Sequence, residues 1–135
     1  MPHLVILYTP NLEAEADMTA LCRSLADIML ATRDEEGKQV FPTGGTRVLA
    51  YPAAHFAVAD GKADYGFIYL NVRMATGRSS ATIKRAGDAL LAGARAHFGT
   101  LFERKAVGMT LQIDESPGQA YDGKHSSLHP LFNKA

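Results

Sequence analysis

Three residues of this sequence have the chemistry of a proton-transfer site for an acidic substrate, namely Pro2, Arg47 and Arg78. The side chain of Pro2 is small enough for removal of Met1 to be expected, which would leave a free secondary amine in front of the apolar run "LVIL". We expect burial beside that run to disfavour the protonated amine and to lower its pKa toward neutrality. A neutral amine can act as a general base. A Met-Pro start without any chemical role is the alternative.

The two arginines are suited to binding carboxylates. Arg47 begins a segment that is otherwise apolar, "VLAY", and Arg78 directly precedes Ser79, a predicted helix N-cap. A guanidinium can bind a carboxylate through two parallel hydrogen bonds, and a helix N-terminus attracts anions. The alternatives are an edge residue with its head in water for Arg47 and a solvated loop charge for Arg78.

Other familiar kinds of site have no support in the sequence. The segments "PTGGTR" and "ATGRSS" lack the spacing of a phosphate-binding loop, and no G-x-S-x-G hydrolase motif occurs. His125 and His129 lie four residues apart, but they belong to a tail without an evident third ligand, so no metal is expected there. Surface or packing roles are predicted for His3, His55 and His97. Cys22 is predicted to be a buried helix residue.

The length, charge and cysteine content of the chain limit its domain organisation and its possible partners. The chain has 135 residues and a mass of 14.5 kDa, which is the size of one domain with its own core. Its 14 Lys and Arg residues balance 14 Asp and Glu residues, so the overall charge favours neither nucleic acid nor an anionic membrane as a partner. The chain has one cysteine and no apolar run long enough to cross a bilayer. We expect one soluble cytoplasmic domain over residues 1–135.

The elements that must position the three residues occur in a repeated order. Residues 4–8 are apolar throughout and predict an interior strand, and an amphipathic helix with Asn11 as its cap follows to about Thr32. After an exposed connection, a second strand begins at Thr46. The remaining elements are a strand over residues 65–74, a helix from Ser79 to about Phe102 and a strand over residues 106–114.

The order of strand, helix and strand therefore occurs twice, over residues 1–60 and 61–115, with a tail over residues 116–135. Each half can close as a right-handed crossover with parallel outer strands. The two halves then predict an α/β (α+β) fold, a four-stranded mixed sheet with both helices on one face. Because residues 4–7 are apolar on both faces of their strand, something must cover the second face, and the simplest cover is another copy of the chain. We expect a homo-oligomer, with the tail docked at a subunit interface.

Together, these features resemble the 5-carboxymethyl-2-hydroxymuconate isomerase family of the tautomerase superfamily, over nearly the whole chain. The similar stretches are "MPHLVI", "EAEAD", "FPTGGTRV", "VADGKADYGFIYLNVRMATGRS" and the terminal "HPLF". The connection "TRDEEGKQVFP" is longer than the corresponding family turn, and "VLAYPAAHF" is less polar than in relatives. The resemblance implies a homotrimer with one site per chain, to which the first half brings Pro2 and Arg47 and the second half Arg78.

The resemblance also implies a cofactor-independent isomerase. The family reaction converts 5-carboxymethyl-2-hydroxymuconate to 5-carboxy-2-oxohept-3-enedioate in homoprotocatechuate degradation, a part of aromatic catabolism. Pro2 would act as acid and base, while Arg47 and Arg78 would bind carboxylates of this small, unsaturated substrate. Two alternatives remain open. One is a tautomerase-fold enzyme acting on another acidic substrate, such as a phenylpyruvate-like enol or a haloacrylate, and the other is a non-catalytic oligomeric binding protein.

Overall fold

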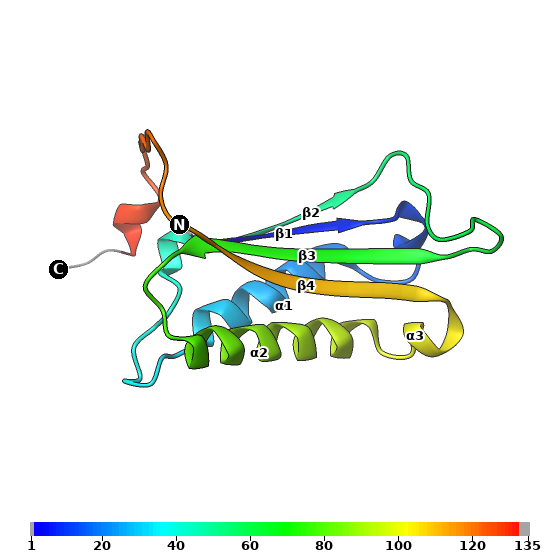
Figure 1. Ribbon diagram of the computed structural model, residues 1–135, viewed down its shortest axis with the longest axis horizontal. Coiled ribbons are helices and arrows are strands. Elements are labelled where there is room, and N and C mark those ends of the chain that lie inside the picture. The colour runs from blue at the N-terminus through cyan, green and yellow to red at the C-terminus, as the bar shows by residue number, and fades with distance from the viewer. Residues whose placement is uncertain (1, 133–135) are drawn as a thin grey trace.

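The strands of the structure form one mixed sheet. The computed structural model describes residues 2–132. Within them, the sheet order is β2-β1-β3-β4 (Figure 1), formed by β1 (His3–Tyr8), β2 (Arg47–Pro52), β3 (Gly66–Ala75) and β4 (Val107–Ser116). β1 runs parallel to β2 and antiparallel to β3, and β3 runs parallel to β4. The predicted four-stranded mixed sheet is confirmed.

Two long helices, α1 (Met18–Ala31) and α2 (Ser80–Phe98), cover one face of this sheet (Figure 1). α1 packs against β2, α2 packs against β4, and the two helices contact each other. The prediction of two helices on one face is therefore confirmed. None of the helices within residues 2–132 is long and apolar enough to cross a lipid bilayer.

The ends of α2 are set by a serine and a glycine. Ser79 Oγ accepts a hydrogen bond from the Thr82 backbone N–H at 3.1 Å, so the predicted N-cap is confirmed. The helix ends before Gly99, whose φ of +57° lies in the left-handed region that favours glycine. The chain then forms the short helix α3 (Leu101–Arg104), so the expectation of one unbroken helix to Phe102 is wrong.

The start of α1 differs from the prediction. Its N-cap is Asp17, whose side chain accepts a hydrogen bond from the Ala20 backbone N–H at 3.0 Å. Asn11 lies earlier, in the 3-10 turn η1 (Pro10–Leu12). The prediction that Asn11 caps this helix is wrong because its side-chain amide donates to the start of β3 instead, to the Tyr65 carbonyl oxygen at 2.7 Å.

The core lies between the sheet and the two helices. Alternate strand residues point toward the helices, so that Leu4 and Ile6 of β1 and Leu70 of β3 are fully buried. Helix residues at three- and four-residue spacing, such as Leu21 and Leu25 of α1, meet them and are also fully buried. Burial of these apolar side chains holds the register of the sheet, because a slip by one residue would turn each of them to the other face.

The opposite face of the sheet is uncovered in the single chain. Leu7 of β1 and Leu49 and Tyr51 of β2 point to this face, with exposed fractions of 44%, 43% and 49%. The pairing of Leu7 with Tyr51 and of Val5 with Leu49 makes this exposed area continuous across the two strands. An apolar area of this kind on a sheet is a feature of surfaces that bind another protein.

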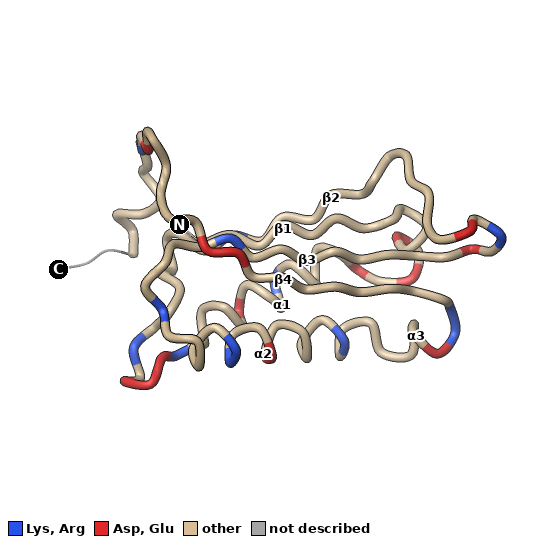
Figure 2. Tube along the Cα trace, in the orientation of Figure 1, with Lys and Arg blue, Asp and Glu red and all other residues tan. Residues whose placement is uncertain are grey.

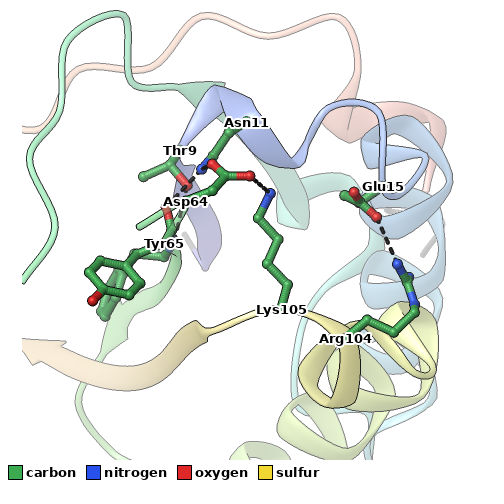
Figure 3. Close-up of polar contacts among 8 residues, drawn as sticks. Thr9, Asn11, Glu15, Asp64, Tyr65, Arg104 and Lys105 are labelled. Atoms are coloured by element: carbon green, nitrogen blue, oxygen red, sulfur yellow. Dashed lines mark hydrogen bonds and ion pairs between the residues drawn. The ribbon is translucent and has the colours of Figure 1, made fainter. Parts of the chain in front are cut away.

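A polar cluster closes the end of the sheet at which β1 ends and β3 begins (Figure 3). Asn11 Nδ2 donates to the Tyr65 carbonyl oxygen and, at 2.8 Å, to Asp64 Oδ1. Lys105, from the turn before β4, forms an ion pair with Asp64. Hydrogen bonds from Lys105 and Asn11 hold the pKa of the Asp64 carboxyl below its usual range. The cluster joins η1 to the starts of β3 and β4.

We expect Asn11→Ala to lower the free energy of unfolding by about 1–3 kcal/mol, because the Tyr65 carbonyl oxygen loses its side-chain donor. Urea unfolding followed by circular dichroism measures this loss, and Lys62→Ala, a change of an exposed side chain in the preceding turn, is the control. An unfolding midpoint equal to that of the unmodified protein would show that this hydrogen bond contributes nothing to stability.

Candidate active site

The topology brings Pro2, Arg47 and Arg78 to one end of the sheet. Pro2 directly precedes β1, Arg47 is the first residue of β2, and these strands are parallel. β3 is antiparallel to β1, so its last residue, Ala75, lies at the same end, three residues before Arg78. Residues far apart in the sequence therefore lie at the same end of the sheet.

Pro2 is buried, as are Leu4 and Ile6, which follow it on the side of β1 that faces the helices. Met1, whose removal the predicted chemistry requires, lies outside the described residues. Burial of a free amine at this position would disfavour its protonated form, because a charge is poorly solvated there.

Arg47 belongs to a row of polar residues that crosses the uncovered face. The strand pairing places Arg47 beside His3, His3 beside Arg73, and Arg73 beside Asp114. Arg47 and Arg73 are both exposed and stand two strands apart, or about 10 Å, on either side of the residue that follows Pro2. Figure 2 shows both signs of charge at this end of the sheet, where the acidic end of β4 adjoins basic residues. Sequence reasoning missed Arg73, because only the register of β1 with β3 brings it beside His3.

Arg78 is held in a fixed orientation by main-chain and ring contacts. Its Nη1 donates to the Ala75 carbonyl oxygen at 2.9 Å and its Nη2 to the Val40 carbonyl oxygen at 3.0 Å. The central guanidinium carbon lies 5.6 Å from the ring centre of Phe41, which is fully buried. A guanidinium has five N–H donors, so these two hydrogen bonds leave three for an acidic ligand. The half-buried Arg78 is thus not a solvated loop charge.

The N-terminus of α2 holds a carboxylate of the protein itself. Ser79 Oγ donates to Glu35 at 2.8 Å, and the Thr82 hydroxyl donates to the same carboxylate. These hydrogen bonds, first from Thr82 and then from Ser79, hold the pKa of the Glu35 carboxyl below its usual range. The sequence favoured this helix end as support for a substrate anion beside Arg78, and the structure places Glu35 there instead.

Two surface pockets lie away from this end of the sheet. One, of about 410 Å³, is lined by Tyr8, Glu13 and Cys22 among others, and the second, of about 780 Å³, lies along the carboxyl-terminal part of α2. Neither is lined by Pro2, Arg47 or Arg78. Cys22 is partly buried, and burial raises the pKa of its thiol, which makes it a weak nucleophile.

The tail returns to the end of the sheet where β2 begins (Figure 1). Its 3-10 turn η3 (His129–Leu131) packs on η2 (Thr43–Gly45), the turn that leads into β2. Gly44 is required at this contact, because a Cβ atom there would lie 2.8 Å from His129 Nδ1 and 3.0 Å from its Cα. Much of the tail's apolar surface is exposed nevertheless, including Leu128, Leu131 and Phe132. Docking of the tail at a subunit interface stays a prediction.

The histidines of the chain are spread over different elements. His97 Nε2 lies 2.9 Å from the Asp17 carbonyl oxygen, in agreement with a packing role, and His55 is exposed. His125 is exposed in the tail, while His129 packs on Gly44. Within residues 2–132, no group of three or more His, Cys, Asp or Glu side chains is arranged to bind a metal ion.

Comparison with known proteins now defines the family. The family model described as 5-carboxymethyl-2-hydroxymuconate isomerase matches residues 2–132. The 5-carboxymethyl-2-hydroxymuconate Delta-isomerase of Escherichia coli is 26% identical over 132 residues, which cover 98% of this chain and 99% of that protein.

Solved structures agree with this match. The crystal structure of a 5-carboxymethyl-2-hydroxymuconate delta-isomerase is 54% identical, with a TM-score of 0.94, covering 100% of this chain and 95% of that one. The crystal structure of a 5-carboxymethyl-2-hydroxymuconate isomerase from Deinococcus radiodurans R1 is 30% identical, with a TM-score of 0.85, covering 98% and 95%. The resemblance found in the sequence is confirmed, and the chain belongs to the 5-carboxymethyl-2-hydroxymuconate isomerase family.

Proposed function

We propose that this protein converts 5-carboxymethyl-2-hydroxymuconate to 5-carboxy-2-oxohept-3-enedioate without a cofactor, with Pro2 as acid and base. The observation that carries the proposal is the convergence of Pro2, Arg47 and Arg78 at one end of the sheet. A buried secondary amine at the same end of the sheet as several cationic side chains suits a substrate that has several carboxylates and one acidic hydroxyl group. The names of the family relatives support the same substrate.

In the proposed reaction, the neutral amine of Pro2 accepts the proton of the 2-hydroxyl group. The O–H bond breaks, the C2–O bond becomes a carbonyl, and the C2–C3 double bond moves to C3–C4. The electrons of the former C4–C5 double bond then take the proton from Pro2 to form a C5–H bond. The amine is neutral again at the end, so one group serves as base and then as acid.

The arginines have two tasks in this proposal. Each guanidinium binds a carboxylate, and together they stabilise the negative charge that develops on the dienol oxygen. Arg78 is suited to this because its contacts with Ala75, Val40 and Phe41 set its orientation before the substrate binds. Positive charge near Pro2 also disfavours a second cation there, and so favours the neutral amine.

We also propose that the protein acts as a homotrimer. The partly exposed side chains of Leu7, Leu49 and Tyr51 form an apolar area that another copy of the chain would bury.

Pro2→Ala is expected to lower kcat/KM by about 10²- to 10⁴-fold, because the primary amine is a poorer base in this position. The ultraviolet absorbance of the dienol measures ketonisation directly, and mass spectrometry of both proteins establishes that Met1 has been removed. The control is Pro52→Ala, which changes an exposed proline at the other end of β2. A fully processed Pro2→Ala protein with unchanged kcat/KM would exclude Pro2 as the base. Faster turnover of a phenylpyruvate enol or a haloacrylate would instead reassign the substrate.

Sedimentation equilibrium of the unmodified protein is expected to give three times the mass of the chain. Leu49→Lys is expected to give a smaller species, because burying a charge on the uncovered face is unfavourable. Lys84→Ala, on the exposed side of α2, is the control and should leave the mass unchanged. A fully active monomer would contradict the proposed assembly.

A further inference from the structure

The connection between α1 and β2 is bound to the start of α2. We call residues 33–39 of this connection the strap; the isolated bridge between Arg33 and Gln39 joins its two ends. Asp34 accepts hydrogen bonds from the backbone N–H groups of Glu36 and Lys38 at 2.8 and 2.9 Å, which closes the turn between them. The strap is therefore an ordered hairpin-like turn.

Side chains at two places attach the strap to α2. Arg85 Nη1 donates to the Arg33 carbonyl oxygen at 2.7 Å. Glu35 accepts from Ser79 Oγ at 2.8 Å through Oε1 and at 2.9 Å through Oε2, and Oε1 also accepts from the Thr82 hydroxyl. The partial positive charge at the N-terminus of α2 favours a carboxylate here. Glu35 is thus the acidic side chain that joins the strap to the helix.

The contacts between the strap and α2 lie close to Arg78, both along the chain and in space. Ser79, which donates to Glu35, is the next residue after Arg78. The chain that leaves the strap contains Val40 and Phe41, whose carbonyl oxygen and ring contact the Arg78 guanidinium. The Val40 backbone N–H also donates to the Thr32 carbonyl oxygen at 3.1 Å, and Phe41 is fully buried. Release of the strap from α2 would therefore loosen the contact of these two residues with Arg78 without removing it.

We propose that Glu35 is a positioning residue: by binding the N-terminus of α2, it keeps Val40 and Phe41 in place and so orients the Arg78 guanidinium. The inference rests on the proposed role of Arg78 in binding a substrate carboxylate. Glu35 itself does not touch the substrate in this account. Its effect on the reaction passes through Arg78 alone, which separates it from a residue that only stabilises the fold.

The test is a double-mutant cycle between Glu35→Gln and Arg78→Ala, with kcat/KM for the dienol as the measurement. Glu35→Gln keeps the shape of the side chain but removes the charge. It is expected to lower kcat/KM by about tenfold, the effect of one hydrogen bond to a charged group. Arg78→Ala should lower it by about 10- to 150-fold. In the Arg78→Ala background, Glu35→Gln should change kcat/KM by less than about twofold.

The matched control is Glu36→Gln, the neighbouring exposed carboxylate, whose ion-pair partner is Lys38 at 3.7 Å. It should leave kcat/KM unchanged. Thr82→Val, which removes one donor to Glu35 and keeps the side-chain shape, is a second route to the same defect if Glu35→Gln does not fold. Nitrogen NMR of the arginine side chains should show a shifted Arg78 signal in Glu35→Gln and an unshifted one in Glu36→Gln.

The outcomes separate the two proposals. If Arg78→Ala has unchanged kcat/KM, the proposed function of Arg78 is wrong. If Arg78→Ala is impaired but Glu35→Gln lowers kcat/KM by the same factor with and without Arg78, Glu35 acts on stability only and the inference is overturned. Unchanged kcat/KM in Glu35→Gln would overturn it as well.

Discussion

The register of β1 with its two neighbours is the constraint on which the candidate site depends. Leu4 and Ile6 are fully buried toward the helices, and a slip by one residue would exchange them for His3 and Val5. The register that buries them also sets His3 between Arg47 and Arg73. Core packing thereby determines which polar residues surround the start of β1, where Pro2 lies.

The two faces of the sheet serve different purposes. The face toward α1 and α2 supplies the stability of the chain, while the other face combines exposed apolar residues with a polar row at the Pro2 end. A side chain on this second face does not occupy space in the core, so basic residues can stand there at the same end of the sheet as the buried Pro2. Such a division explains how a small domain can keep a charged site next to its interior, and it fits the assembly that we propose.

Much of the fold could be predicted from local patterns, whereas the details of the site depend on contacts between distant segments. The apolar run after Pro2 and the helical spacing of Leu21 and Leu25 are local signals, and they predicted the elements well. The capping role expected of Asn11 was wrong, because its amide contacts Tyr65 across the fold. The contact of Glu35 with the N-terminus of α2 likewise joins distant segments of the chain, and no spacing in the sequence indicates it. Pro2, Arg47 and Arg78 could be singled out from the sequence, but the groups that contact the Arg78 guanidinium could not.

Catalysis by Pro2, as proposed, requires its amine to be neutral when the substrate binds. The most direct measurement is a titration of the Pro2 nitrogen by NMR in protein whose Met1 has been removed, beside the pH dependence of kcat/KM. We expect the amine to lose its proton at a pH below the ordinary α-amino value of about 8, and kcat/KM to rise with the same midpoint, because burial and nearby arginines disfavour the cation. A midpoint at or above the ordinary α-amino value of about 8 would contradict the proposed role of Pro2. So would a kcat/KM that does not change over the pH range in which the amine titrates.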